Sequence, residues 1–284
     1  MGIQIKNIFY TYQKKATNAT LALNDISLEI KDNEFVAIVG ETGSGKSTLA
    51  QTFNALLVPD QGDVVVGDYL INYKNRKSRK LKGLRQHVGL VFQFPEYQLF
   101  EETVEKDVAF GVKNFGVKNE EALNRAHEAL KQVGLDETYY KRAPFDLSGG
   151  EKRKVALAGI LAINPDILIF DEPTVGFDPQ SSKDLMNLIC DFHKQGKTII
   201  VITHDMDLVN TYAQRAILLE KGQLAFSGSP SGLFEFIKGY DRLDVPSVIK
   251  VAERLKEKGV DINPKQIRDI DDLVLAINKW RNKA

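Results

Sequence analysis

Alternation of apolar and polar residues near the start of the chain predicts strands. The alternation runs from Ile3 to Tyr12 and again from Ala22 to Ile30, with the two-residue period of a half-buried strand. Residues 35–39 form a short apolar run that reads as a further strand, and residues 63–67 and 69–71 read as a hairpin. An N-terminal antiparallel β subdomain is therefore expected.

Later apolar runs indicate a parallel sheet. Residues 167–170 are continuously apolar, which is typical of a strand buried on both faces, and residues 198–203 read as another central strand. Residues 87–92 are a strand that ends before a proline. Residues 216–219 and 223–226 are expected as edge strands that close the domain.

Helical spacing of apolar residues marks an insertion between these strands. Residues 120–133 are expected to form a surface helix of a mainly helical subdomain, inserted at about residues 95–160, with His127 exposed to solvent. The apolar residues from 155 to 162 continue a second helix that starts near Ser148.

After Gly239 the pattern of apolar residues changes from that of strands alternating with helices to that of helices alone. Two amphipathic helices, 245–258 and 271–281, look too short to fold alone, so they are expected to pack against the main body or a partner chain. We therefore divide the chain into a main domain, residues 1–238, and a C-terminal helical extension, residues 239–284.

Composition narrows the classes of function. The chain has 284 residues, of which 43% are apolar, so it can bury a complete hydrophobic core. Its formal net charge is zero, so no overall positive electrostatic potential favours binding of nucleic acid. No signal peptide and no apolar run of about 18 residues is present, which predicts a protein that is cytosolic or held at a membrane only by partners. The basic cluster at 74–82 is expected to be a solvated loop; contact with lipid headgroups or an acidic partner is the alternative.

A glycine-rich segment between a strand and a helix predicts phosphate binding. It follows the strand at 35–39 and precedes a stretch from Leu49 to Leu57 that is compatible with a helix. Glycines let backbone N–H groups converge on a polyphosphate, and the helix adds the positive end of its dipole. Lys46 would reach the β- and γ-phosphates, and the Ser47 hydroxyl would bind the Mg²⁺ that bridges them. The segment consists of Gly40, Glu41, Thr42, Gly43, Ser44, Gly45, Lys46, Ser47 and Thr48.

A second segment offers another anion site at the start of a helix. Ser148 can cap the helix, and Gly149 and Gly150 permit close approach of a ligand to the backbone. Taken alone, such a segment is more often a plain helix cap.

Polar side chains at the ends of the parallel strands suggest hydrolysis. Asp171 and Glu172 follow the strand at 167–170, where paired carboxylates are costly without a positive partner. Mg²⁺ held by Asp171 would compensate them, and Glu172 would polarise a water for attack on the γ-phosphate. A structural pair of buried carboxylates is the alternative.

Three further side chains are candidates for the same site. Gln93 and His204 each follow a parallel strand, where an α/β sheet presents groups to ligands, and His204 is expected near Glu172. His204 would hold the γ-phosphate and the attacking water in line, unless it is simply a hydrogen-bonded histidine. Tyr12 would stack on an adenine, or else is a half-buried strand aromatic.

The complete set resembles the ATP-binding-cassette (ABC) ATPase family over about residues 3–235. The resemblance implies an α/β fold with a P-loop NTPase (RecA-like) core, the β subdomain and the inserted helices. It also implies ATP and Mg²⁺ as cofactors, roles for Lys46, Gln93, Glu172 and His204 in catalysis, and Mg²⁺ contacts for Ser47, Gln93 and Asp171. Glu151 departs from the usual Gln and places a negative charge near the phosphate site, and 175–178 replaces the usual small-residue D-loop. The matching motifs are the A-loop Tyr12, Walker A 40–48, the Q-loop Gln93, the signature 147–151, Walker B 167–172, the D-loop Asp178 and the H-loop His204.

Within that family, residues 91–104, 107–111 and 114–117 are similar to the ATPases of energy-coupling factor transporters, closest to the second of two ATPase types. The C-terminal helices resemble the extension that helps to hold two such ATPases together. This implies a head-to-tail heterodimer with a second, different ABC ATPase, in which Ser148, Gly149 and Gly150 cap the γ-phosphate of ATP on the partner's P-loop.

The same resemblance implies a peripheral location on the cytoplasmic face of the membrane. There the ATPase pair would lie under a membrane coupling protein (T component) and a membrane substrate-binding protein (S component), and would power import of vitamins or transition-metal ions. Alternatives are the ATPase of an importer with a soluble binding protein, a non-transport cassette of DNA repair or the ribosome, and a regulatory module without turnover.

Overall fold

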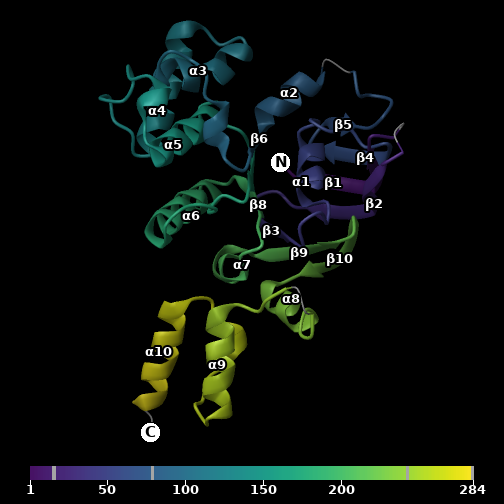
Figure 1. Cartoon of the computed structure of the whole chain (residues 1–284), viewed down its shortest axis with the longest axis vertical. Coiled ribbons are helices and arrows are strands. Elements are labelled where there is room, and N and C mark those ends of the chain that lie inside the picture. Colours follow the sequence, from purple (N-terminus) through teal and green to yellow (C-terminus); the bar gives the residue numbers. More distant parts are fainter. Residues whose placement is uncertain (15–16, 78–79, 241–242, 283–284) are drawn as a thin grey trace.

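The computed structural model describes residues 1–14, 17–77, 80–240 and 243–282, and its strands form two sheets (Figure 1). The first sheet has the strand order β2-β1-β4-β5, and its strands pair antiparallel, as the alternating pattern predicts. Its strands are β1 (Ile3–Tyr12), β2 (Thr20–Ile30), β4 (Gln61–Val66) and β5 (Tyr69–Ile71).

The second sheet has the order β10-β9-β3-β8-β7-β6. Neighbouring strands from β9 to β6 pair parallel, whereas β10 pairs antiparallel with β9. All residues of β3 and β8 are buried, which explains their continuous apolar runs. The strands are β3 (Phe35–Val39), β6 (Val88–Val91), β7 (Ile167–Asp171), β8 (Thr198–Ile202), β9 (Arg215–Glu220) and β10 (Gln223–Gly228).

One strand prediction was wrong. Residues 216–219 were expected at an edge, but β9 lies between β3 and β10, so β10 alone forms that edge. The physical reason is visible in the sequence: Ala216 to Leu219 are continuously apolar and fully buried, which is typical of an interior strand.

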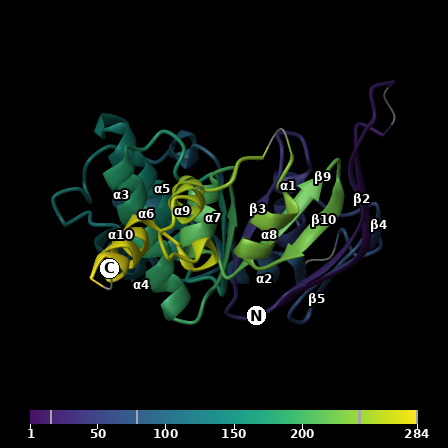
Figure 2. The same ribbon diagram turned by 90° about the horizontal axis from the view of Figure 1, so that it is seen from below.

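The helices lie around the parallel sheet. Figure 1 shows α3, α4 and α5 gathered on the side away from the antiparallel sheet, and Figure 2 shows the same separation from below. The helices are α1 (Lys46–Phe53), α2 (Lys80–His87), α3 (Val104–Asn114), α4 (Asn119–Gln132), α5 (Gly149–Leu161), α6 (Pro179–Lys194), α7 (Met206–Tyr212), α8 (Pro230–Phe236), α9 (Ser247–Glu257) and α10 (Ile270–Arg281).

Helix α1 is anchored between the two sheets. Leu49 and Phe53 are fully buried and share one core cluster with residues of both sheets, including Ile8 of β1 and Ile38 of β3. The helix begins at Lys46, earlier than Leu49, and ends at Phe53, earlier than Leu57. It ends there because Ala55 has a φ of 55°, in the left-handed region that interrupts a helix.

The C-terminal helices pack against the main body, one of the two expected arrangements. Val248, Ala252 and Leu273 share a core cluster with Val209 of α7 and Leu233 of α8. The side-chain amide of Asn210 also donates hydrogen bonds to the carbonyl oxygens of Ile267 at 2.9 Å and Arg268 at 2.8 Å. In Figure 1 the two helices extend at the end opposite α3 and α4.

His127 is not simply exposed, contrary to expectation. Its Nε2 atom lies 2.9 Å from Oε2 of Glu105, and its ring stacks on Tyr140 with ring centres 4.1 Å apart. Glu105 is buried and also pairs with Lys141, because a buried carboxylate needs positive or hydrogen-bonding partners. The charged neighbours of His127 in sequence do not reveal this contact.

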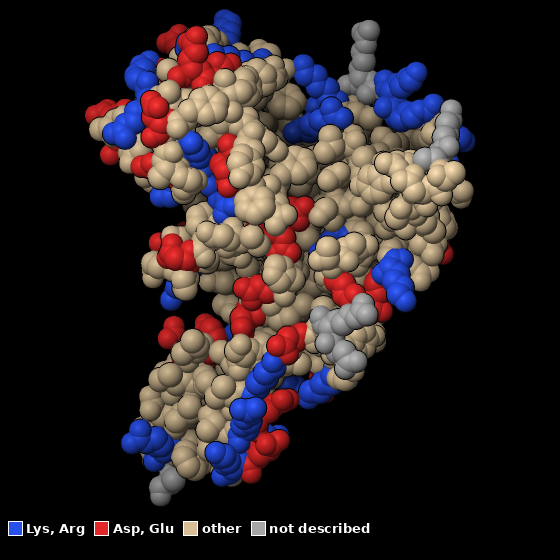
Figure 3. Space-filling model, viewed as in Figure 1, with Lys and Arg blue, Asp and Glu red and all other residues tan. Residues whose placement is uncertain are grey.

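The basic cluster at 74–82 is partly helical rather than a loop. Lys80 and Lys82 belong to α2, whose Leu81 and Leu84 face the core. Figure 3 shows Lys and Arg side chains gathered at the upper right of the molecule, in the region where Figure 1 places α2. Arg79 of the cluster lies outside the described residues.

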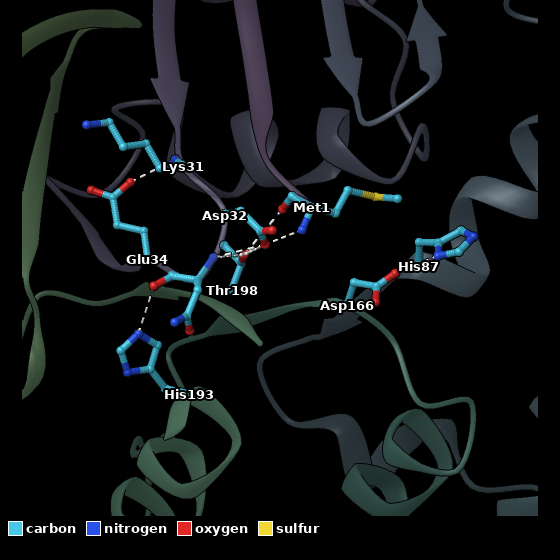
Figure 4. Close-up of polar contacts among 9 residues, drawn as sticks. Met1, Lys31, Asp32, Glu34, His87, Asp166, His193 and Thr198 are labelled. Atoms are coloured by element: carbon cyan, nitrogen blue, oxygen red, sulfur yellow. Dashed lines mark hydrogen bonds and ion pairs between the residues drawn. The ribbon is translucent and has the colours of Figure 1, made fainter. Parts of the chain in front are cut away.

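A polar network closes the amino-terminal edge of the parallel sheet (Figure 4). The hydroxyl oxygen of Thr198, fully buried at the start of β8, accepts a hydrogen bond from the N–H of Asn33 at 3.0 Å. The same hydroxyl lies 3.2 Å from the carbonyl oxygen of Met1, to which it donates. Nearby, Nδ1 of His87 lies 2.6 Å from Oδ2 of Asp166. This network therefore joins β8 to the turn between β2 and β3.

We expect Thr198→Val to lower the free energy of unfolding by about 1–3 kcal/mol, because the hydrogen bonds of the fully buried hydroxyl with the N–H of Asn33 and the carbonyl oxygen of Met1 are lost. Urea denaturation measures this change, and Thr20→Val, at an exposed strand position, is the matched control. ATP affinity should stay unchanged, because Thr198 lies at the opposite end of β8 from His204. Equal stability of the two variants would contradict the assigned role of the hydroxyl.

Candidate active site

The glycine-rich loop joins β3 to α1 and takes a shape that only glycine adopts easily. Gly40 has a φ of 143° and Gly45 a φ of 101°. A Cβ atom on Gly40 would lie 2.3 Å from the carbonyl oxygen of Leu219, and one on Gly45 would lie 2.5 Å from that of Ala22. The loop is therefore held against β9 and β2, in the strand, loop and helix context of a phosphate-binding loop.

Lys46 lies at the centre of this loop. Its buried ammonium group donates hydrogen bonds to the carbonyl oxygens of Gly40 and Glu41, each at 2.8 Å. Burial lowers the pKa of Lys46, while the charges of Glu172 and Asp171 act in the opposite direction. Lys46 is therefore a cation within electrostatic reach of both carboxylates.

Two of the three residues expected to contact Mg²⁺, Ser47 and Asp171, are brought together. Asp171 ends β7, and burial raises the pKa of its carboxyl group, although a hydrogen bond from the Ser47 hydroxyl opposes that shift. A hydroxyl and a carboxylate are oxygen ligands of the kind that Mg²⁺ prefers. Among the described residues, no cluster of three or more His, Cys, Asp or Glu side chains could hold a metal ion.

Glu172 and His204 form a second pair at the same sheet edge. Oε1 of Glu172 lies 2.8 Å from Nδ1 of His204; the Glu172 side chain is 15% exposed and that of His204 is 70% exposed. Glu172 has a φ of 50°, and its N–H donates to the carbonyl oxygen of Ile202 at 2.9 Å. The predicted proximity of His204 to Glu172 is confirmed.

Tyr12 and Gln93 lie at the rim of this group. The Tyr12 hydroxyl lies 3.2 Å from Oγ1 of Thr48 in α1, and the Tyr12 ring is partly exposed. Gln93 is exposed and follows β6, the neighbour of β7 in the sheet. Tyr12 is therefore placed to meet a ligand that lies on the glycine-rich loop, whereas Gln93 is exposed at the end of the outermost parallel strand.

The serine and glycine segment lies elsewhere, at the start of α5. Ser148 accepts a hydrogen bond from the N–H of Glu151 and donates its hydroxyl to Oε2 of Glu151 at 2.7 Å. These hydrogen bonds hold the pKa of Glu151 below its usual value, and Tyr139 donates to its Oε1 at 2.9 Å. Cβ atoms on Gly149 or Gly150 would meet nothing within 4 Å. Packing within this chain therefore does not require glycine at either position.

Comparison with known proteins decides the family. The family model described as "ABC transporter" matches residues 23–175, more than half of the chain. The energy-coupling factor transporter ATP-binding protein EcfA2 of Streptococcus agalactiae is 47% identical, covering 98% of this chain and 99% of the relative. The protein of the same name from Streptococcus thermophilus is 49% identical, covering 91% and 93%. The chain belongs to the energy-coupling factor branch of the ABC ATPases.

Solved ABC ATPases share the fold. The cbiO1 protein of Clostridium perfringens, described as part of the ABC transporter complex cbiONQ, is 36% identical with a TM-score of 0.73, covering 90% of this chain and 96% of that one. A dimeric ATP-binding cassette in a post-hydrolysis state with ADP and Pi is 32% identical with a TM-score of 0.71, covering 80% and 98%. The expected P-loop NTPase fold is therefore confirmed.

As an ABC ATPase the chain binds ATP. Tyr12 of the A-loop contacts Thr48 of Walker A, while the Walker B carboxylates and the H-loop histidine lie at the carboxyl ends of the neighbouring strands β7 and β8. The signature segment instead starts α5 in the helical subdomain (Figures 1 and 2). Within the described part of the chain, no helix has both the length and the apolar character needed to cross a bilayer.

Proposed function

We propose that this chain binds and hydrolyses ATP as a subunit of an energy-coupling factor importer, powering uptake of vitamins or transition-metal ions. The observation that carries the proposal is the convergence of Lys46, Ser47, Asp171, Glu172 and His204 at one sheet edge. The relatives that match almost the full length of the chain are named as ATP-binding proteins of that transporter class.

The residues divide the chemistry between binding and hydrolysis. Backbone N–H groups of Gly43 to Thr48 and the Lys46 ammonium bind the phosphates, and Tyr12 stacks on the adenine. Ser47, Asp171 and Gln93 would hold Mg²⁺, which neutralises charge on the β- and γ-phosphates. Glu172 orients and polarises the attacking water, and His204, hydrogen-bonded to Glu172, helps to place it in line with the γ-phosphate.

We further propose a head-to-tail dimer with a second, different ABC ATPase. The signature segment starts a helix of the helical subdomain, while the chain's own P-loop lies between β3 and α1. Gly149 and Gly150 are exposed and have open space where a side chain would lie, so their glycine character suits close approach by another molecule. In this arrangement Ser148, Gly149 and Gly150 contact ATP on the partner's P-loop.

The C-terminal extension, residues 239–284, supports this pairing in the proposal. Its helices bury one face against the main body, but four large apolar residues of α9 and α10 stay exposed. Large apolar side chains that stay exposed on both helices suit a contact with another protein. We therefore assign them to the contact with the second ATPase, beyond the main domain of residues 1–238. They are Val251, Ile270, Val274 and Leu275.

The segment after Gln93 is the proposed contact with the membrane coupling protein. Tyr97 is 84% exposed, and Phe100 packs edge to face on Phe110 with ring centres 4.8 Å apart, although both rings are exposed. Such aromatic groups are typical of interface anchors. Through this contact the chain would lie on the cytoplasmic face of the membrane, as a peripheral subunit below the T and S components.

Mass spectrometry of the detergent-extracted native complex tests the proposal. We expect a second ABC ATPase, a membrane coupling protein and a small integral substrate-binding protein to co-purify with this chain. Recovery of a permease together with a soluble binding protein would instead support the competing importer class. Recovery of ribosomes or DNA-repair proteins without membrane proteins would contradict a role in transport.

A further inference from the structure

Arg153 of α5 contacts two other segments, each of which adjoins a different motif. Its Nε and Nη2 atoms donate to the two carboxylate oxygens of Glu96 at 3.2 and 3.3 Å, and its Nη1 atom donates to the carbonyl oxygen of Val175 at 2.7 Å. Its guanidinium also lies over the ring of Phe177, 4.5 Å from the ring centre. Arg153 thereby ties the signature helix to the segment after Gln93 and to the turn after Walker B.

The contact with Val175 leads directly to Glu172. The N–H of Val175 donates to the carbonyl oxygen of Glu172 at 3.4 Å, within the turn that follows β7. Glu172 is held at a φ of 50°, a backbone conformation that is strained for a non-glycine residue and persists only where its surroundings enforce it. Arg153 and Glu172 also line one cavity of about 530 Å³ together with Phe94 and Phe177.

The environment of Arg153 favours a strong interaction. The side chains of Arg153 and Glu96 are 13% and 17% exposed, so solvent screens their ion pair only weakly. Both carboxylate oxygens are engaged, a geometry that fixes orientation as well as distance. A shift of Glu96 would therefore move the guanidinium that also holds the Val175 carbonyl.

We propose that Arg153 is a positioning residue that couples the segment at 94–98 to the backbone orientation of Glu172. The proposal rests on the proposed function, which places this segment against a membrane partner. Displacement of Glu96 by that partner would shift Arg153 and break its hydrogen bond to the Val175 carbonyl oxygen. This would change how the Glu172 carboxylate meets the attacking water. Arg153 itself touches neither nucleotide nor water in this scheme.

The test compares Arg153→Met with Lys154→Met in the assembled transporter complex. Lys154 is the exposed neighbour on the same helix, and methionine keeps the helix propensity and much of the side-chain length in both variants. We expect Arg153→Met to lower kcat for ATP hydrolysis about tenfold with KM for ATP close to wild type. Loss of the largely buried ion pair also lowers the melting temperature, so kcat is measured well below the onset of unfolding. Lys154→Met should leave all three quantities unchanged.

A double-mutant cycle with Glu96→Gln identifies the partner. Glu96→Gln should lower kcat about threefold, and the double variant should be no slower than Arg153→Met alone, because both changes break one chain of contacts. Additive losses would contradict the coupling. An unchanged kcat in Arg153→Met would also contradict it. So would a fall in kcat that is fully explained by the fraction of complex that is unfolded at the assay temperature.

Arg153→Lys provides a second variant in case methionine prevents folding. Lysine keeps the charge but cannot donate to both Glu96 oxygens and to Val175 at once, so kcat should still fall severalfold at unchanged KM. Wild-type kcat in this variant would overturn the proposal. If instead the wild-type complex hydrolyses no ATP, the proposed function fails, and this result is distinct from any failure of the Arg153 variants.

Discussion

Replacement of Glu172 by glutamine is expected to lower ATP hydrolysis by about 10²–10⁴-fold while ATP affinity stays within about twofold of wild type. Glutamine preserves size and can still lie beside His204, but it cannot accept a proton from the attacking water. Removal of a negative charge near Lys46 also lessens repulsion of the phosphates. Phosphate release by the assembled complex measures the turnover, and equilibrium binding of ATP measures the affinity.

The same variant should accumulate an ATP-bound closed dimer, because closure needs bound ATP and reopening needs hydrolysis. Size-exclusion chromatography of the ATPase pair with ATP and Mg²⁺ would show this as a larger species than in wild type. Glu120→Gln, an exposed position at the start of α4, is the matched control and should behave like wild type. Wild-type turnover in Glu172→Gln would refute the role of this carboxylate.

Replacement of Lys46 by alanine is expected to weaken ATP binding about 10- to 100-fold. The loss reflects a charge-assisted hydrogen bond to phosphate, worth about 1.5–3 kcal/mol. The change also removes two hydrogen bonds to Gly40 and Glu41, so a thermal melt must accompany the calorimetric titration with ATP.

An exposed lysine provides the comparison for that titration. Lys131→Ala on α4 removes the same charge far along the chain from the P-loop and should leave ATP affinity unchanged. If Lys46→Ala bound ATP as tightly as Lys131→Ala, the P-loop cradle would not be the phosphate site.

Local patterns predicted the parallel sheet and the position of its functional ends. The apolar run Ile167 to Phe170 does form a strand buried among neighbours, and it delivers Asp171 and Glu172 to the edge that also carries the P-loop. This worked because the carboxyl ends of parallel strands share one edge, so that sequence position alone implies spatial proximity.

Features that depend on tertiary partners were not predictable in the same way. Arg153 contacts Glu96, 57 residues away, and Val175, 22 residues away, and no local spacing indicates either partner. The buried Glu105 that binds His127 is likewise 22 residues distant in sequence. Side chains of this kind are recognised only when the packing of the helices is known.

Two features at helix ends also have a local signal in the sequence. Ser148 and Glu151 have the three-residue spacing of a capping box. The Glu151 carboxylate therefore forms hydrogen bonds with Ser148 at the start of its own helix. Gly45 is followed directly by Lys46 as the first helical residue, so the glycine with positive φ marks the true start of α1. Both signals concern the ends of helices, where apolar periodicity gives no information.

A crystal structure of the Glu172→Gln ATPase pair with ATP and Mg²⁺ tests the central assignment most directly. Our account predicts that the γ-phosphate contacts the Lys46 ammonium, that the metal contacts the Ser47 hydroxyl beside Asp171, and that residue 172 reaches the terminal phosphate through one water. A nucleotide whose phosphates lie away from residues 43–48, or on the opposite side of the sheet from residue 172, would contradict it.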